Sequence, residues 1–98
     1  MVQTNLRTAG ALARRLGVRV RPSTTEHKKL DVLRGGRKVA SIGDIRYEDF
    51  LTHRDPNRRR LYKIRHGKTR SVKGSPSYYA DQILWPTDRA LAPALRTR

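Results

Sequence analysis

Two successive glycines, Gly35 and Gly36, constrain the fold of this sequence more than any other feature. They separate two short β-prone runs, residues 29–34 and 37–42, and a Gly-Gly pair between such runs is typical of a tight β-hairpin turn. Centring the turn on the glycines sets the predicted pairing: Val32 with Val39, Leu33 with Lys38 and Asp31 with Ala40. A lone hairpin is only marginally stable in water, so we expect its apolar face to pack against helices.

The strongest helix signals follow the hairpin. Asp55-Pro56 and Ser75-Pro76 each place a capping side chain directly before a proline, a residue favoured at the first position of a helix. They predict helices over residues 56–66 and 76–85. Weaker patterns predict a helix over residues 45–53, capped by Asp44, and an amphipathic N-terminal helix over residues 4–16.

Length and composition predict one small α+β domain. The chain has 98 residues, of which 36% are hydrophobic, so its core must be modest. We expect a β-hairpin packed on two or three short helices, with an N-terminal amphipathic helix and extended basic arms. The predicted divisions are an N-terminal helix and linker arm (1–27), a compact domain (28–85) and a C-terminal arm (86–98). The predicted core is Leu30, Val32, Val39, Ile42, Phe50, Leu51, Leu61, Ile64, Tyr79, Ile83, Leu84 and Trp85.

Several function classes are disfavoured by what the sequence lacks. Cysteine is absent, so there is no disulfide framework, thiol nucleophile or cysteine zinc site. No apolar run approaches the ~20 residues that span a bilayer. The triplets at residues 67–69 and 53–55 match only fragments of a phosphate-binding loop and a kinase catalytic loop. We therefore predict no catalytic, cofactor-binding or metal-binding residues and no small-molecule substrate, and we do not expect an enzyme.

Positive charge is the most prominent chemical feature. Lys and Arg number 23 against 8 acids, which gives a net charge of +15. Such an excess implies an acidic partner, which can be nucleic acid, an acidic protein surface or an anionic membrane surface. The densest region is residues 54–73, whose side chains suit phosphate and carboxylate groups. The candidate partner-binding residues are Arg54, Arg58, Arg59, Arg60, Lys63, Arg65, His66, Lys68, Arg70 and Lys73.

The helix predicted in this region has two sides. Leu61 and Ile64 point one way and are expected to face the core, whereas Arg59 and Lys63 belong to the other, solvent-facing side. Tyr62 falls on the cationic side, where its ring is a candidate for stacking on an exposed base.

Several blocks of the sequence resemble the basic adaptor domain of chlorella viruses and other large DNA viruses. The blocks are residues 59–66 (RRLYKIRH), 72–76 (VKGSP) and 78–85 (YYADQILW), with 39–43 (VASIG) and 47–50 (YEDF) upstream. The resemblance covers residues 30–85, and residues 1–27 and 86–98 have no counterpart in the family. It implies a non-enzymatic adaptor or interaction role and names no partner.

Three functions remain open at this point. The first is a virion structural or adaptor protein, a minor capsid component that docks acidic surfaces of other virion proteins and ties neighbours with its arms, found in the virion and the infected host cell. The second is a sequence-nonspecific nucleic-acid-binding protein, contacting the phosphate backbone of DNA or RNA. The third is a module that recruits a kinase or another enzyme.

Overall fold

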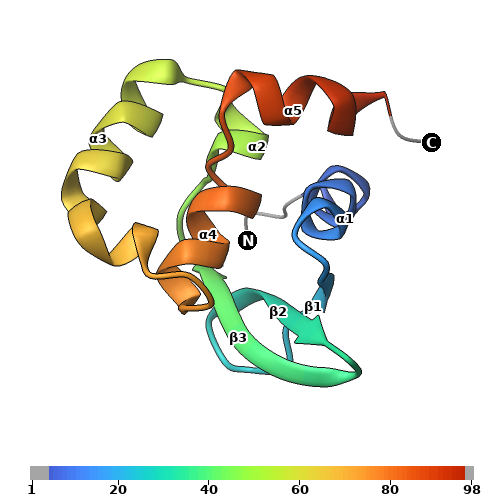
Figure 1. The fold of residues 1–98 in the computed structure, drawn as a ribbon. Coiled ribbons are helices and arrows are strands. Elements are labelled where there is room, and N and C mark those ends of the chain that lie inside the picture. The colour runs from blue at the N-terminus through green and yellow to red at the C-terminus, as the bar shows by residue number, and fades with distance from the viewer. Residues whose placement is uncertain (1–4, 97–98) are drawn as a thin grey trace.

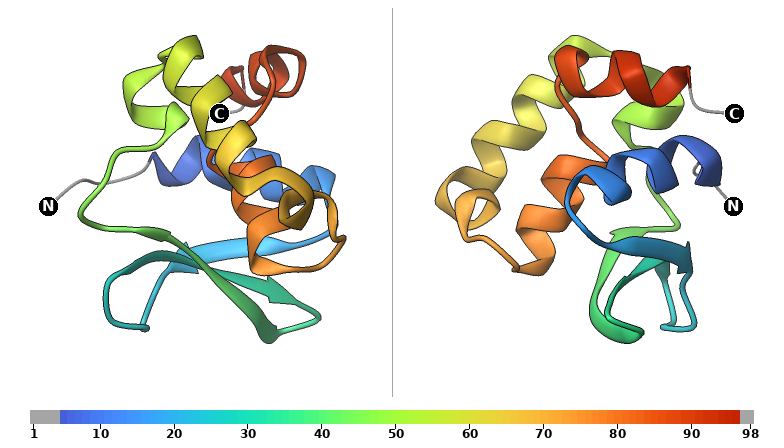
Figure 2. Two further views of the ribbon diagram at one scale, coloured as in Figure 1. Left: turned by 90° about the vertical axis from the view of Figure 1, so that its left-hand side faces the viewer. Right: turned by 45° about the vertical axis from the view of Figure 1, so that its right-hand side comes forward.

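A three-stranded antiparallel sheet is the base of the fold, and the helices lie on one side of it (Figures 1 and 2). The computed structural model describes residues 5–96. Within them the elements follow in the order α1 (Leu6–Arg15), β1 (Arg19–Pro22), β2 (Lys28–Arg34), β3 (Arg37–Asp44), α2 (Phe50–His53), α3 (Pro56–His66), the 3-10 helix η1 (Gly67–Ser71), α4 (Pro76–Ile83) and α5 (Asp88–Leu95). The α+β class predicted from the sequence is confirmed.

Side-chain caps fix where the longer helices begin. Asp55 accepts a hydrogen bond from the backbone N–H of Asn57 at 2.9 Å, and Ser75 accepts one from Tyr78 at 3.1 Å. Each such bond satisfies a donor that the first helical turn leaves without an intrahelical partner. The two proline-started helices are therefore confirmed, although α4 ends at Ile83 and not at residue 85.

The hairpin forms at the two glycines, but its register changes after the first pairs. Leu33 lies opposite Lys38 as predicted, whereas Val32 lies opposite Ala40. A β-bulge inserts Val39 as an extra residue between these pairs. Val39 is therefore 41% exposed and Ala40 is buried. The predicted pairs Val32 with Val39 and Asp31 with Ala40 were each wrong by one residue, because the hydrophobic pattern carries no signal for a bulge.

A buried carboxylate joins the strands on the other side of the sheet. Asp31 of β2 accepts hydrogen bonds from the hydroxyls of Ser23 at 2.6 Å and Ser41 at 2.8 Å, and from the N–H of Thr24 at 3.3 Å. Burial alone would raise the pKa of Asp31, but these hydrogen bonds hold it well below its usual range. The ionised side chain thus links the end of β1 to β3. The predicted linker part of residues 1–27 therefore contains a strand, β1.

The described parts of both segments predicted as arms, residues 5–27 and 86–96, belong to the folded body. Residues 86–96 contain α5, which is capped by Thr87, buries Ala90, Leu91 and Ala94, and packs against α1. In turn, α1 packs against β1 and α4 and buries Leu12 completely. The prediction of extended arms was wrong, because these short apolar stripes are needed to complete a small core.

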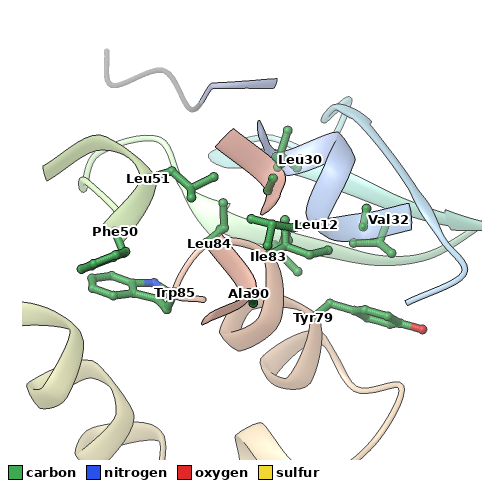
Figure 3. Close-up of a cluster of buried hydrophobic side chains, with 14 of the residues drawn as sticks. Leu12, Leu30, Val32, Phe50, Leu51, Tyr79, Ile83, Leu84, Trp85 and Ala90 are labelled. Carbon is green, nitrogen blue, oxygen red and sulfur yellow. The ribbon is translucent and has the colours of Figure 1, made fainter. Parts of the chain in front are cut away.

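Most of the predicted core is confirmed (Figure 3). The buried predicted residues are Leu30, Val32, Ile42, Phe50, Leu51, Tyr79, Ile83, Leu84 and Trp85. Three predicted members are wrong: Val39, Leu61 and Ile64 are exposed. Residues of α1 and α5, together with Tyr62, complete the core instead.

The helix predicted over residues 45–53 is reduced to the single turn of α2. Its N-cap is Asp49, while Asp44, the predicted cap, ends β3. Asp44 accepts hydrogen bonds from the guanidinium of Arg46 at 2.7 Å and from its backbone N–H at 2.9 Å. The hydrogen bonds from Arg46 hold the pKa of Asp44 well below its usual range and close a turn where the helix was expected.

Candidate binding groove beside helix α3

Helix α3 contacts the rest of the protein through the side that was predicted to face solvent. Tyr62 is only 7% exposed, whereas Leu61 is 51% and Ile64 is 64% exposed. Arg59 and Lys63 follow the same inward side. The predicted orientation was wrong, because the aromatic ring and the two long cationic side chains find internal partners that two aliphatic residues do not.

An aromatic stack anchors this helix. The rings of Tyr62 and Trp85 have centroids 4.3 Å apart and planes within 6° of parallel, and the ring of His66 lies 4.1 Å from Tyr62. Tyr62 is thus packed between two side chains, so its predicted role in stacking on a base is wrong for this structure. Burial, reinforced by nearby Asp81, raises the pKa of Tyr62 to about 12, and its hydroxyl stays neutral.

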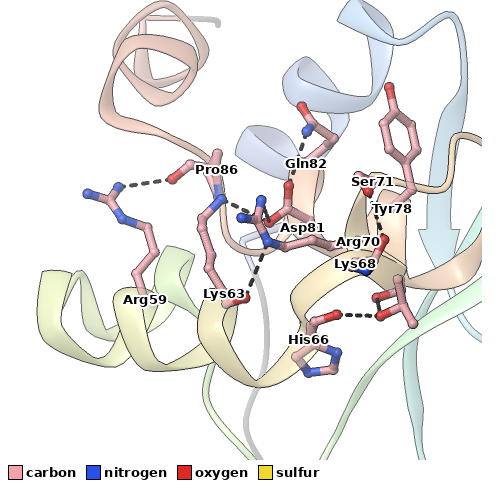
Figure 4. Close-up of polar contacts among 12 residues, drawn as sticks. Arg59, Lys63, His66, Lys68, Arg70, Ser71, Tyr78, Asp81, Gln82 and Pro86 are labelled. Atoms are coloured by element: carbon pink, nitrogen blue, oxygen red, sulfur yellow. Dashed lines mark hydrogen bonds and ion pairs between the residues drawn. The ribbon is translucent and has the colours of Figure 1, made fainter.

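Arg59, one of the candidate cations, is part of the scaffold (Figure 4). Its guanidinium lies 4.2 Å above the ring of Phe50 and donates hydrogen bonds to the carboxylate of Asp88 at 2.8 Å and the carbonyl of Pro86 at 3.0 Å. Cation–π and charge-assisted contacts of this kind fix a guanidinium in one orientation. Arg59 therefore fastens α3 to α2 and to the start of α5.

Two further candidate cations converge on one buried carboxylate. Lys63 donates to Asp81 of α4 at 2.9 Å, and the guanidinium of Arg70 lies 3.8 Å from the same oxygen (Figure 4). Arg70 also donates to the carbonyl of Lys63 at 3.3 Å. These contacts hold α3 and η1 against α4. Lys63 cannot bind a partner without giving up its bond to Asp81, whereas the side chain of Arg70 is 37% exposed.

Replacing Lys63 by Gln is expected to lower the free energy of unfolding by about 1–3 kcal/mol, because Asp81 loses a charged donor. Arg60→Gln is the matched control. Arg60 is an exposed cation of the same helix with no acidic partner within residues 5–96, and its loss should change stability by less than about 0.5 kcal/mol. Urea denaturation measures the free energy of unfolding of both variants. Equal effects would show that Lys63 does not hold α3 in place.

The other candidate cations lie at the surface. Arg58 pairs with Glu48 at 3.1 Å, and Arg54 donates to the carbonyl of Leu51 at 3.1 Å. Four of the candidate cations are exposed and have neither an acidic partner nor a side-chain hydrogen bond within the described residues: Arg60, Arg65, Lys68 and Lys73. The candidate set predicted from the sequence thus divides into an internal group and an outward group.

A groove of about 1320 Å³ runs between α3 and the end of β3. One wall is formed by α3 and the following residues to Val72, and the other by the end of β3 and the loop to Asp49. Residues of α4, with Leu84 and Trp85, line it between these walls. This volume exceeds the ~300–1,000 Å³ of typical small-ligand sites, and its size suits a segment of polypeptide.

Exposed apolar side chains gather along this groove. Tyr47, Leu61, Ile64 and Val72 line it, and they are four of the seven large apolar side chains that are exposed in the described part of the chain. Single exposed apolar residues are ordinary, but their concentration over one concave surface indicates an interaction site. Sequence reasoning missed this site because it assigned two of the four to the core.

The charge that remains unpaired in the groove is positive. Its three acids are already paired with cations: Asp44 with Arg46, Glu48 with Arg58 and Asp49 with Lys29. Two lining cations on opposite walls, Lys28 of β2 and Arg65 of α3, have no acidic partner within residues 5–96. An occupant with acidic groups is therefore favoured.

Two histidines flank the aromatic stack. The ring of His53 lies 5.3 Å from that of Trp85, and its Nδ1 accepts a hydrogen bond from the N–H of Asp55 at 2.9 Å. This bond requires a ring without a proton on Nδ1. Burial and, secondarily, Arg58 lower the pKa of His53, and burial and Arg65 lower that of His66.

Stability is expected to fall as the pH drops through 6.5, the ordinary pKa of histidine. The unfolded chain binds protons there that the folded chain does not, so acid favours unfolding until the lowered folded pKa values are passed. Thermal melts at a series of pH values above and below 6.5 test this dependence of stability on pH. His53→Asn retains an acceptor for the N–H of Asp55 without titrating, and should weaken the dependence. An unchanged dependence would remove His53 as a cause.

The groove is not accompanied by a cluster typical of metal chemistry. Within residues 5–96 no group of three or more His, Cys, Asp or Glu side chains is placed to hold a metal ion. Nor is any helix in the described part of the chain long and apolar enough to cross a membrane. What the groove offers is apolar surface with positive charge beside it.

Together, the fold and the groove define a small basic α+β domain with an exposed apolar groove. The chain belongs to a family of unknown function, DUF5754, whose pattern matches residues 18–66. The match includes β3 and α3, which supply the two walls of the groove. No curated protein and no solved structure shows significant similarity to the chain. The resemblance to the basic adaptor domain of large DNA viruses stays a prediction.

Proposed function

We propose that this protein is a non-enzymatic adaptor that binds an acidic segment of a partner protein in the groove beside α3. The observation that carries this proposal is the cluster of exposed Tyr47, Leu61, Ile64 and Val72 along one groove whose unpaired charge is positive. Protein interfaces combine an apolar centre with a polar rim. A phosphate backbone, in contrast, is bound through cations and hydrogen-bond donors and does not need an aliphatic surface.

The resemblance to the basic adaptor domain supports a setting for this adaptor. We propose that it is a minor structural component of the particle of a large DNA virus, with other virion proteins as partners, present in the virion and the infected cell. The role predicted for extended arms is not part of this proposal, since α1 and α5 are packed into the fold.

Selection of short random peptides against the purified protein at about 0.15 M salt tests the adaptor function. Recovered peptides should combine acidic and apolar residues and should bind Ile64→Glu at least about tenfold more weakly, a loss of about 1.4 kcal/mol. Leu95→Glu is the matched control, because Leu95 is also exposed but lies on α5 outside the groove. Equal binding to Ile64→Glu and the wild type would exclude the groove, and failure to recover any peptide would contradict the adaptor function.

The second candidate is sequence-nonspecific nucleic-acid binding. It is favoured by the exposed cations Arg60, Lys68 and Lys73, which have no acidic partner within the described residues, on a chain of net charge +15. Fluorescence anisotropy with random-sequence duplex DNA over a salt series tests it, because neutralising several phosphates gives a steep salt dependence. Weak binding that is lost by about 0.15 M salt would reject this function.

A further inference from the structure

We infer that the groove binds its occupant as an added β-strand. An extended acidic segment would pair its backbone with the free edge of β3 and direct alternate apolar side chains toward α3. This inference rests on the proposed adaptor function and adds the way in which the partner is recognised.

Strand β3 is an edge strand with unused backbone groups. The strand order β1-β2-β3 leaves one side of β3 without a neighbouring strand. In the described chain, no backbone group outside the sheet is hydrogen-bonded to residues 37–43. The opposite edge, β1, has only four residues and ends at Pro22, so β3 is the better template for an added strand.

The groove borders this edge and not just one face of the sheet. The hydroxyl of Ser41 bonds to Asp31, whereas the neighbouring side chain of Ile42 is buried in the core on the helix-covered side. Successive strand residues point to opposite faces, yet both Ser41 and Ile42 line the groove. A cavity that touches both must run along the edge between the faces.

The opposite wall fits the side chains of such a strand. Leu61 and Ile64 on α3 offer apolar contacts, and Lys28 and Arg65 offer positive charge from the two walls. A segment in which acidic and apolar residues alternate would place its apolar side chains on one face and its carboxylates on the other. A helix would leave the β3 edge unpaired, since its own backbone groups are already bonded to one another. Peptide addition to an exposed sheet edge is a known mode of recognition.

Two peptides of identical composition separate a strand from a helix. One alternates Glu and Val, and the other contains the same residues with the valines on one helical face. By fluorescence anisotropy at about 0.15 M salt, the alternating peptide should bind at least about tenfold more tightly, because only it can combine edge hydrogen bonds with apolar contacts. Tighter binding of the helical peptide, or binding of neither, would overturn the strand proposal.

Backbone methylation of the alternating peptide tests the hydrogen bonds directly. Only every second N–H of an added strand points at the edge it joins. Methylating the alternate nitrogens that face β3 should weaken binding more than about tenfold. Methylating the intervening nitrogens, which face away from β3, should weaken binding less than about threefold. Equal effects of methylating the two sets of nitrogens would contradict strand addition. Hydrogen exchange gives a second readout: in the complex, amides within residues 41–43, the part of β3 that lines the groove, should gain protection.

Failure of this inference can be distinguished from failure of the proposed function. If the helical peptide binds and Ile64→Glu abolishes that binding, the groove is an adaptor site but the strand mode is wrong. If the random-peptide selection also yields no peptide whose binding depends on the groove, the adaptor function and the strand mode of binding are both wrong. If the alternating peptide binds Ile64→Glu and wild type alike, its site lies elsewhere and the strand proposal is overturned.

Discussion

Replacing Lys29 by Met is expected to lower the free energy of unfolding by about 3–5 kcal/mol. The Nζ of Lys29 lies 2.7 Å from Oδ2 of Asp49, and both side chains are buried. Removing the cation takes the Lys29 ammonium away from a buried carboxylate, and a charge in a site of low dielectric constant is poorly solvated. Urea denaturation of the variant at neutral pH measures the loss.

The double variant Lys29→Met with Asp49→Asn separates charge from packing. Asn removes the buried charge while keeping the shape of the side chain, so at least about half of the lost stability should return. Lys29 also packs over Gly43, where an added Cβ would lie 3.0 Å from its Cδ. If the double variant is no more stable than Lys29→Met, the loss arises from this packing and the charge account is wrong.

Replacing Trp85 by Ala is expected to cost about 3–5 kcal/mol. The ring of Trp85 stacks on Tyr62 and lies beside His53, and it lines the groove. Its loss removes the main apolar contact that holds α3, so amides of α3 should exchange faster relative to those of β2. Hydrogen exchange followed residue by residue measures this difference.

Trp85→Phe is the control for this effect. A phenyl ring retains part of the stack on Tyr62, so its cost should be smaller and the protection of α3 should be largely kept. If α3 exchanges at the wild-type rate in Trp85→Ala, then the ion pairs of Arg59 and Lys63 alone hold the helix, and the stack is not its anchor.

Features that depend on neighbouring residues were predictable from the sequence. The Gly-Gly turn and the caps at Asp55 and Ser75 act within a few residues, and all three form where predicted. The bulge at Val39 and the inward turn of Tyr62 were not predictable, because each depends on packing against distant elements. In α3 the decisive partners are Trp85, Asp81 and Asp88, which the local pattern does not contain.

Two missed elements did carry a usable signal. Val18 and Val20 alternate with Arg19 and Arg21, a period-two pattern that favours a strand, and β1 begins at Arg19. In α5 the cap at Thr87 and the apolar spacing were present in the sequence, but residues 86–98 were predicted as an extended arm. Pro93 lies inside α5, where its missing N–H removes the one hydrogen bond that would run to the carbonyl of Arg89.

The candidate site was predictable only in part. The sequence correctly indicated a basic region around residues 54–73, but which of its cations face outward follows from tertiary ion pairs. Arg59, Lys63 and Arg70 are held by Asp88 and Asp81. The groove itself has no sequence motif, because its lining comes from β3, α3 and α4 and from loops between them.

The most direct test of the proposed adaptor function is an NMR titration at about 0.15 M salt, with the acidic alternating peptide and, separately, with random-sequence duplex DNA. We expect the peptide to shift the Trp85 indole signal and the methyl signals of Leu61 and Ile64, which line the groove, and we expect DNA to leave these signals in place. If the peptide shifts none of these signals while DNA binds tightly through the outward cations, the groove is not the functional site and the chain is a nucleic-acid-binding protein.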